Sequence, residues 1–332
     1  MTTISNRCEI LFLYDIENAN PNGDPNDENK PRIDEETGKN IVTDVRLKRT
    51  IRDYLLENGD DIFVQEKTSD DEGHIQTGKQ RALDYLKSVD SLEDKNAEQQ
   101  KVIISDNILN QCIDVRLFGA TIPLELKVQD KNDKAKSKNV TSSITYTGPA
   151  QFRIGKSLHA VKTMFVKGTG AFASKEGATQ KTFREEYVLP YSLIGFYGIV
   201  NENAARHTKL TVEDVAKMKK AMWNGTKGLI SRSKFGQMPR LLLMIEYKET
   251  NFFIGELDNR IKLKTDILDS KIRKPEDYAV DLTELLTLVE TYKDKIKKIG
   301  YVTDSKMTFV QNENGFDFKT NPLFVDESAE VL

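Results

Sequence analysis

The chain has 332 residues, of which 38% are apolar and 30% are charged, and its formal net charge is −3. This balance is typical of a soluble globular protein and excludes a uniformly basic nucleic-acid-binding protein. Any site for a polyanion must therefore be a local basic patch, with acidic charge placed elsewhere on the surface.

The two cysteines, Cys8 and Cys112, belong to no C-x-x-C pair or disulfide framework. They are expected to be buried packing residues in a reducing compartment. The first residues lack the apolar run and cleavage site of a signal peptide, and no stretch approaches the ~20 apolar residues of a membrane span. We therefore expect a cytoplasmic protein without a membrane partner.

The N-terminal part begins with a short apolar and aromatic run, Cys8–Ile16, which predicts a buried strand. Residues 17–40 are rich in Asn, Pro, Gly and Asp, a composition typical of loops. Thr43 and Asp44 then predict the start of a helix that runs to Glu57, where Asn58 and Gly59 end it.

The middle of the chain is expected to hold three departures from a simple core. Residues 65–112 are polar with helical stretches and predict a helical insertion. Residues 127–140 are lysine-rich without apolar periodicity and predict a flexible loop. After strand-like residues 144–161, residues 162–186 predict a protruding hairpin whose glycine-rich segment spans Lys167–Gln180.

The remaining elements are strands at Tyr187–Val200 and Arg240–Tyr247, a helix at Val212–Trp223 and an amphipathic helix at Asp281–Ile299. The core order is then strand, helix, strand, strand, helix, strand. This order predicts an α+β fold, the ferredoxin-like βαββαβ arrangement of RNA-recognition domains, in one domain over residues 1–332 with insertions.

The helix at residues 43–57 carries the most informative pattern. Leu47, Ile51 and Leu55 share its apolar face. The rest of its surface holds four basic side chains: Arg46, Lys48, Arg49 and Arg52. Asp44 and Asp53 are spaced to pair with Lys48 and Arg49, which leaves Arg46 and Arg52 without a helical partner. A phosphate-binding face is predicted, and a solvated basic face is the alternative.

The loop before this helix is rich in amides, which are frequent partners of phosphate oxygens. Its residues Asn18, Asn20, Asn22 and Gly23 imitate the first half of an EF-hand loop. Asn29 stands where the calcium-binding Glu should be, so we expect no metal there. A ligand-contacting loop and a plain surface loop remain as alternatives.

A second loop, residues 231–236, combines Ser231, Arg232 and Lys234 with a glycine. Such a loop can cradle phosphates with its backbone N–H groups. Short basic loops are also common on surfaces, so this signal is weak when taken alone.

Motifs for catalysis are largely absent from the sequence. There are three histidines, without zinc-type spacing, and there is no Walker-type loop or G-x-S-x-G. We expect no cofactor and no catalytic residue. The enzymatic alternative is a metal-dependent endoribonuclease that uses the loop carboxylates Asp24, Asp27 or Asp34.

Six segments in order resemble the CRISPR-associated backbone subunit (RAMP superfamily, Csh/Csd-type) of type I Cascade complexes, and the type I-B branch matches best. They are CEILFLYDIENANPNGDP, VTDVRLKRTIRDYL, DVRLFGA, GPAQFRIGKSLH, GTGAFAS and REEYVLPYSLIGFYGIVNENAA. The resemblance covers residues 8 to 248 and continues less distinctly to the C-terminus.

The resemblance implies a modified RRM core described as palm, fingers and thumb, in a non-catalytic subunit. Copies of it would polymerise along the spacer of a CRISPR RNA, beside repeat-processing, large and small Cascade subunits. Target DNA would be reached through the RNA, because base pairing reads the sequence while the protein holds the backbone. Relatives in type III complexes cleave RNA with a loop aspartate. An interaction module that binds no RNA is a third possibility.

The resemblance also assigns roles to residues. Asn20, Asn22 and Gly23 would line the RNA, and Lys48, Arg49 and Arg52 would meet its phosphates. Gln151 and Arg153 would lie on the palm, and 162–186 would form the thumb. Met164 or Phe172 would displace a base there, beside Lys167. Ser231, Arg232 and Lys234 would close the groove from the other side.

Overall fold

The computed structural model describes residues 2–86, 95–129, 137–173 and 181–332, with side chains left out at 127–129, 137–138, 170–173 and 181–184. These residues divide into two compact units. Unit 1 holds residues 1–5, 52–151 and 200–218, and unit 2 holds residues 6–51, 152–199 and 219–332. The predicted single domain with a 65–112 insertion is thus too simple, because further residues on both sides fold with the insertion.

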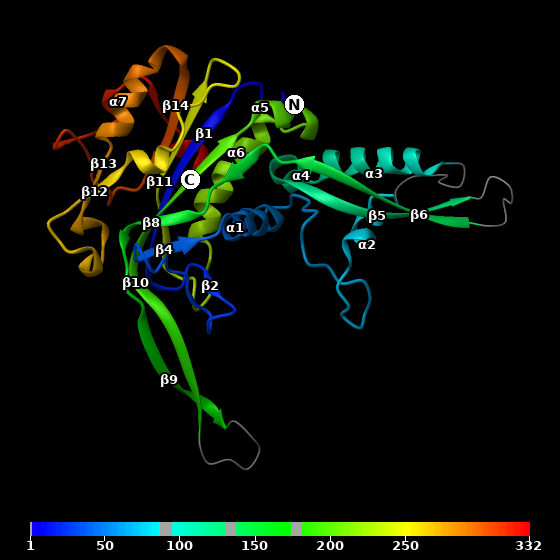
Figure 1. Cartoon of the computed structure of the whole chain (residues 1–332), viewed down its shortest axis with the longest axis horizontal. Helices are drawn as coiled ribbons and strands as arrows, with labels where there is room; N and C mark the ends of the chain where they lie inside the picture. Colours follow the sequence, from blue (N-terminus) through cyan, green and yellow to red (C-terminus); the bar gives the residue numbers. More distant parts are fainter. Residues whose placement is uncertain (1, 87–94, 130–136, 174–180) are drawn as a thin grey trace. The chain divides into compact units, whose positions relative to one another are not determined.

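Unit 2 is built on the main sheet, which has nine strands among the described residues (Figure 1). The path of the sheet is β17 (Phe324–Asp326), β14 (Ile296–Thr303), β11 (Gln237–Tyr247), β1 (Cys8–Ala19), β10 (Lys181–Val200), β8 (Gly155–Ala160) and β4 (Lys39–Val42). Off this path, β7 (Ala150–Phe152) and β9 (Met164–Ala173) each pair with β10. β1 lies between β11 and β10 in the middle of the sheet, and its first nine residues are accordingly all buried.

Smaller elements complete unit 2. β2 (Gly23–Asp24) pairs with β3 (Lys30–Pro31), and a second sheet joins β12 (Lys262–Lys264), β13 (Ala279–Asp281), β15 (Phe309–Gln311) and β16 (Asn314–Gly315). The helices are α7 (Thr283–Thr291), α8 (Ser328–Val331) and most of α1 (Asp44–Glu57), in which the boundary between the units falls after Ile51.

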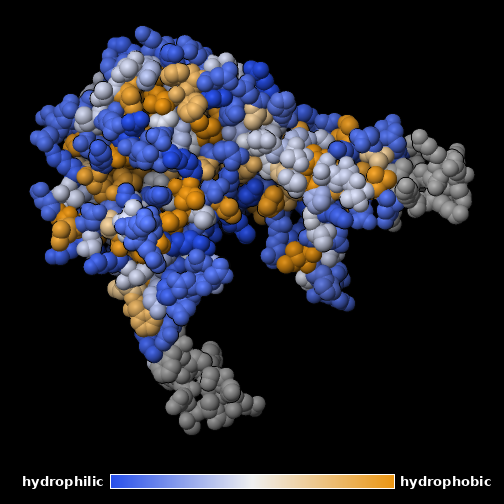
Figure 2. Space-filling view, in the orientation of Figure 1, coloured by the Kyte–Doolittle hydropathy of each residue, from blue (hydrophilic) through white to orange (hydrophobic). Residues whose placement is uncertain are grey.

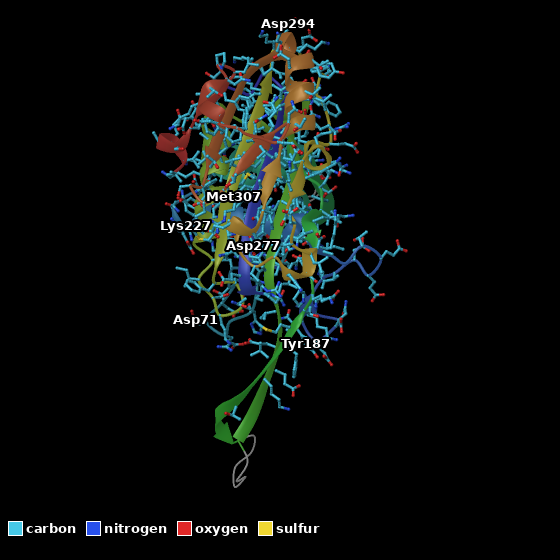
Figure 3. All side chains as sticks on the ribbon, turned by 90° about the vertical axis from the view of Figure 1, so that its left-hand side faces the viewer. Asp71, Tyr187, Lys227, Asp277, Asp294 and Met307 are labelled. Carbon is cyan, nitrogen blue, oxygen red and sulfur yellow. The ribbon has the colours of Figure 1, made fainter. Side chains whose placement is uncertain are left out.

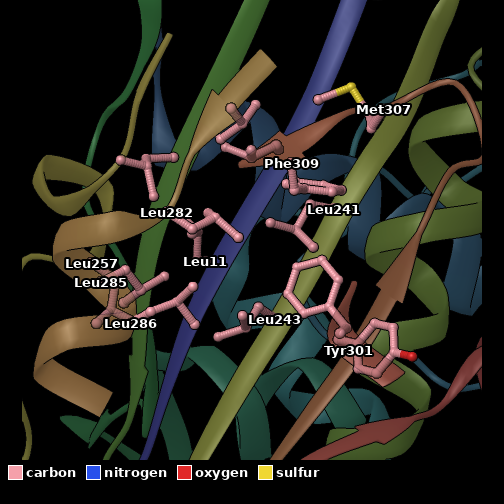
Figure 4. Packing of buried hydrophobic residues seen from close by; sticks show 14 of the residues in the cluster. Leu11, Leu241, Leu243, Leu257, Leu282, Leu285, Leu286, Tyr301, Met307 and Phe309 are labelled. Carbon is pink, nitrogen blue, oxygen red and sulfur yellow. The ribbon is translucent and has the colours of Figure 1, made fainter. Parts of the chain in front are cut away.

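One hydrophobic core cluster of the described residues lies in unit 2. Leu11 of β1 and Leu241 and Leu243 of β11 pack against Leu285 of α7 and Phe309 of β15 (Figure 4). Because side chains alternate across a strand, the odd-numbered apolar residues of both strands share this face. The core therefore fixes β1 and β11, the two strands whose ends lead to the candidate site.

Unit 1 contains α2 (Gly78–Asp84), α3 (Ala97–Gln111), α4 (Ile113–Phe118), α5 (Glu202–Thr208), most of α6 (Val212–Lys220), and the pair β5 (Gly119–Gln129) and β6 (Ser137–Thr147). The predicted flexible loop at 127–140 is wrong at both ends, because Lys127 pairs with Asn139 and Gln129 with Ser137. The apolar alternation that would mark a strand lies earlier, at Ile122–Leu126, and backbone pairing extends the hairpin beyond it.

The predicted helix at Asp281–Ile299 is also wrong in its second half. The helix α7 ends at Thr291, and Ile296 begins β14, which pairs with β11. Ile296 and Ile299 continue the helical spacing of Val289 by seven and ten residues, so periodicity could not reveal the change. By contrast, the helix predicted from Thr43 is confirmed as α1.

The structure confirms the α+β class. The four central strands of the sheet are β11, β1, β10 and β8, in that order. Among the residues described in the structure, no helix is long and apolar enough to cross a membrane.

Candidate functional site

Two loops leave the same end of the β1–β11 pair in unit 2. These antiparallel strands have Ile16 opposite Gln237 as their last pair, so the loop after β1 and the loop before β11 start side by side. The backbone N–H of Asn20 donates to the carbonyl of Ser233 at 2.8 Å, and Lys234 Nζ donates to the carbonyl of Asn20 at 2.5 Å. The amide-rich loop and the 231–236 loop, predicted separately from the sequence, are thus joined.

The start of α1 is fastened to the same amide-rich loop. Asn22 Oδ1 accepts hydrogen bonds from the backbone N–H of Thr43 at 2.9 Å and from its hydroxyl at 3.0 Å. Thr43 Oγ1 in turn accepts from the N–H of Arg46, as an N-cap residue does. We call residues 18–23, 43–49 and 230–236 the sheet-end site.

Gly23 is required by this close packing. A Cβ atom at this position would lie 2.0 Å from Asn29 Oδ1 and 2.8 Å from the Asn29 carbonyl oxygen. Asn29 also accepts a hydrogen bond from Asn20 Nδ2 at 2.6 Å. Any larger residue at Gly23 would displace Asn29 and with it the buried Asn20 side chain.

Lys234 is the most unusual cation of the sheet-end site. Burial first, and then the positive charge of Arg46, lower the pKa of Lys234 from 10.5 to about 8. Among the described residues, no carboxylate lies within ion-pair distance of Lys234. Two neighbouring cations repel each other, and no carboxylate at Lys234 offsets this repulsion. A bound anion would offset it, so the site favours an anion.

The other basic residues of α1 differ in their surroundings. Lys48 pairs with Asp44 at 3.1 Å, as the helical spacing predicts, and Arg49 is exposed. In unit 1, Arg52 Nε donates to Asp114 at 2.9 Å, and its guanidinium lies 5.1 Å from the centre of the Phe118 ring. The inference that Arg52 lacks a partner is therefore wrong, because its partner comes from another element.

The β9–β10 hairpin, which overlaps the thumb predicted at 162–186, is tied to the sheet-end site at its base. Arg232 forms an ion pair with Glu186 of β10 at 2.6 Å. Lys30 Nζ lies 5.1 Å from the ring centre of Tyr187. Tyr187 is labelled in Figure 3, at the point where the hairpin leaves the rest of unit 2. Phe165 of β9 packs on Tyr187 with ring centres 5.1 Å apart.

Exposed apolar side chains lie on the same hairpin. Met164 is 39% and Phe165 48% exposed, and Figure 2 shows an apolar patch where the hairpin leaves the sheet. Lys167 pairs with Glu185 across the two strands at 2.9 Å. The Phe172 side chain lies outside the described residues, so its predicted role stays a prediction.

The two predicted palm residues, Gln151 and Arg153, each have a partner close by in the chain or in the same unit. Arg153 in unit 2 faces Glu256 at 3.7 Å and Asp258 at 3.6 Å, an acidic setting that opposes phosphate. Gln151 in unit 1 donates to the Gly148 carbonyl at 3.0 Å. Their contact with RNA stays a prediction that the local contacts do not favour.

Sequence reasoning missed three exposed apolar residues in the sheet-end site. They are Val45, Ile230 and Phe235, which are 66%, 76% and 66% exposed. Exposed aromatic side chains beside cations are typical of surfaces that bind single-stranded nucleic acid. The signal was present in the order Lys234-Phe235-Gly236, because an aromatic residue inside a short basic loop has little core to pack against.

The loop carboxylates of the nuclease alternative make local contacts. Asp24 pairs with Arg32 at 2.9 Å, and Asp27 pairs with Lys30 at 2.6 Å. Asp34 closes a turn, and hydrogen bonds, first that of Thr37, lower its pKa. Within residues 2–86, 95–129, 137–173 and 181–332, no group of three or more His, Cys, Asp or Glu side chains could hold a metal ion.

The fold and this site define a class: an α+β protein with a cationic, loop-built surface at one end of its main sheet. Residues 6–283 match the family model of CRISPR-associated protein Cas7. The chain is 37% identical over 313 residues to the CRISPR-associated protein Cas7 of Haloferax volcanii, covering 92% of this chain and 89% of the relative. The chain therefore belongs to the Cas7 family.

A solved structure has a similar fold. A chain of a structure described as a CRISPR RNA-guided surveillance complex, pre-nicking, matches with a TM-score of 0.52 and 13% identity, over 96% of both chains. At this identity the match supports the fold alone.

Proposed function

We propose that this Cas7-family protein is a non-catalytic subunit that binds CRISPR RNA and polymerises along the guide as the backbone of a type I, specifically type I-B, surveillance complex. The observation that carries the proposal is the sheet-end site. There the positive charge of Arg46 acts on the buried Lys234, and no carboxylate among the described residues pairs with Lys234. Phosphate is the anion such a site would hold, and contacts to phosphate carry no sequence information. Guide sequences of any composition could then be bound.

The order of the central strands supports the finer fold assignment. Along the chain, the four predicted core strands are β1, β8, β10 and β11. In the sheet they lie side by side in the order β11, β1, β10 and β8, which is fourth, first, third and second. This is the order of a ferredoxin-like sheet, the core of RNA-recognition domains. The β9–β10 hairpin would then serve as the thumb, and Met164 and Phe165 at its base would contact bases.

Purification tests this proposal. Protein expressed with its CRISPR locus should carry RNA of defined length with repeat-derived ends, in complexes that contain several copies of the chain. Recovery of a monomer free of nucleic acid at low salt would contradict it.

The nuclease alternative has a test of its own. A guide-loaded complex incubated with complementary RNA and Mg²⁺ should leave that RNA intact if the subunit is non-catalytic. Cleavage that Asp24→Ala or Asp34→Ala abolishes would replace the proposal with the metal-dependent mechanism.

Binding of RNA should depend on pH through Lys234. With a pKa of about 8 in the free protein, Lys234 is mostly charged below pH 8 and becomes neutral above it. A bound phosphate would raise this pKa, so affinity should be constant below pH 7 and weaken from pH 8 to 9.5, with proton uptake on binding. Fluorescence anisotropy against pH measures this. In Lys234→Arg the same range should be flat, and a flat wild-type profile would contradict the phosphate contact.

A further inference from the structure

The strands that support the sheet-end site contain an irregularity just before it. Leu13 of β1 lies opposite Leu241, but the next residue, Tyr14, lies opposite Pro239. Arg240 is therefore an extra residue on β11, a β-bulge. Bulges re-aim a side chain and increase the local twist, and they occur next to functional sites more often than elsewhere.

The bulge directs Arg240 into a buried polar network. Its Nε donates to Asp15 Oδ2 at 2.8 Å, and its Nη1 donates to Asp304 at 2.7 Å. The Tyr191 hydroxyl also donates to Asp15 at 2.7 Å, and the Tyr278 hydroxyl lies 2.6 Å from that of Tyr191. Asp15 is 2% and Arg240 is 6% exposed. Burial raises the pKa of Asp15, and Arg240 counteracts this.

The network lies close to both loops of the sheet-end site. Asp15 is one residue before Ile16, which forms the last strand pair with Gln237. Beyond that pair, a Cβ atom on Gly236 would lie 3.2 Å from the Glu17 carbonyl oxygen, so the segments that follow β1 and precede β11 are still in close contact. Loss of the bulge would place Tyr14 opposite Arg240 and shift one loop against the other by one residue step, about 3.3 Å. That shift exceeds the length of the hydrogen bond between Lys234 and Asn20.

We propose that the Asp15–Arg240 ion pair is a positioning device for the RNA site: it fixes the bulge, and thereby the register that holds the Asn20 loop against Lys234. The proposal rests on the RNA-binding function proposed above. Neither residue touches the RNA. Arg240 suits the role because its planar guanidinium bonds two carboxylates in fixed directions, which a lysine cannot do.

The same strand supplies a matched control at its other end. Glu9 is fully buried and accepts hydrogen bonds from the hydroxyls of Tyr197 and Tyr247 and from the N–H groups of Ile254 and Gly255. It lies opposite Ile245, far along β11 from Gln237. Tyr247→Phe removes one hydrogen bond from a comparable buried carboxylate without acting on the loops of the sheet-end site.

The experiment measures affinity for a fluorescein-labelled single-stranded RNA at several salt concentrations, together with thermal unfolding. Arg240→Lys should bind about tenfold more weakly, and the slope of log affinity against log salt should fall by about one, because the Lys234 phosphate contact is lost. Tyr247→Phe should lower the unfolding temperature and leave the slope unchanged. A loss of folded protein alone would reduce the amount that binds and would not change the slope.

The outcomes separate the two proposals. If wild-type protein does not bind the RNA, the proposed function fails. If wild type binds and Arg240→Lys keeps its affinity and slope, or if Tyr247→Phe changes the slope equally, the positioning role is wrong. If Arg240→Lys does not fold, Asp15→Asn, which keeps the shape of the side chain and the Arg240–Asp304 pair, is measured against the same criteria.

Discussion

Arg52→Ala is expected to destabilise unit 1 strongly. The substitution leaves the Asp114 carboxylate fully buried without its cation, although the N–H groups of Phe63 and Val64 still donate to it. Removing one partner of a buried ion pair costs about 3–5 kcal/mol, because the remaining charge is not compensated. The cation–π contact with Phe118 is lost as well. Denaturant unfolding monitored by circular dichroism should show the loss.

The control for this prediction is Lys48→Ala on the same helix. Lys48 pairs with Asp44 near the surface, and such a pair contributes about 0.3–0.5 kcal/mol. The basic face of this helix predicts, instead, that Arg52 binds phosphate. If Arg52→Ala loses no more unfolding free energy than Lys48→Ala and weakens RNA binding instead, the phosphate-binding role of Arg52 is right and its structural role is wrong.

The double substitution Arg46→Ala with Lys234→Ala is expected to weaken RNA binding most. Hydrogen bonds to charged groups contribute about 1.5–3 kcal/mol each, so the combined loss should be on the order of 100-fold or more. The salt slope should fall by about two, one for each phosphate contact, and equally for all RNA sequences. Filter binding with two unrelated sequences measures both quantities.

Lys293→Ala with Lys297→Ala is the matched control, since it removes the same charge. Lys293 pairs with Glu290, and Lys297 pairs with Glu246, which faces Cys8 at the end of β11 away from Gln237. This control should change the salt slope by much less. Sequence-selective loss in the Arg46/Lys234 variant would mean that these residues read bases, and equal loss in the control would mean that overall charge alone attracts RNA.

Much of the sheet-end site could be predicted from the sequence, because its residues have local signatures. Amides and glycine after an apolar run mark the loop at 18–23, and Ser231, Arg232 and Lys234 mark the second loop. The pairing of Asn20 with Lys234 could not be predicted, since it depends on β1 and β11 lying side by side across more than 200 residues.

Roles were harder to predict than positions. The resemblance implies that Asn22 lines the RNA, and in the structure its Oδ1 holds the start of α1 through Thr43. Helical spacing alone leaves Arg52 without a partner, because its partner Asp114 is 62 residues away. Likewise, Ile296 kept a helical period although it begins a strand. Local periods and spacings do not report which distant element supplies a partner.

Strand β10 is continuous from Lys181 to Val200, so one strand serves both the hairpin and the main sheet. Lys181 to Val188 pair with β9, and Ile194 and Gly195 pair with β8. The paired hairpin segment thus projects over seven residue steps, about 23 Å. Pro190 lies between the two paired segments and has no N–H to contribute to a ladder. The hairpin and the main sheet therefore share one backbone, and the change of pairing partner from β9 to β8 takes place across Pro190, which leaves no backbone N–H without a partner there.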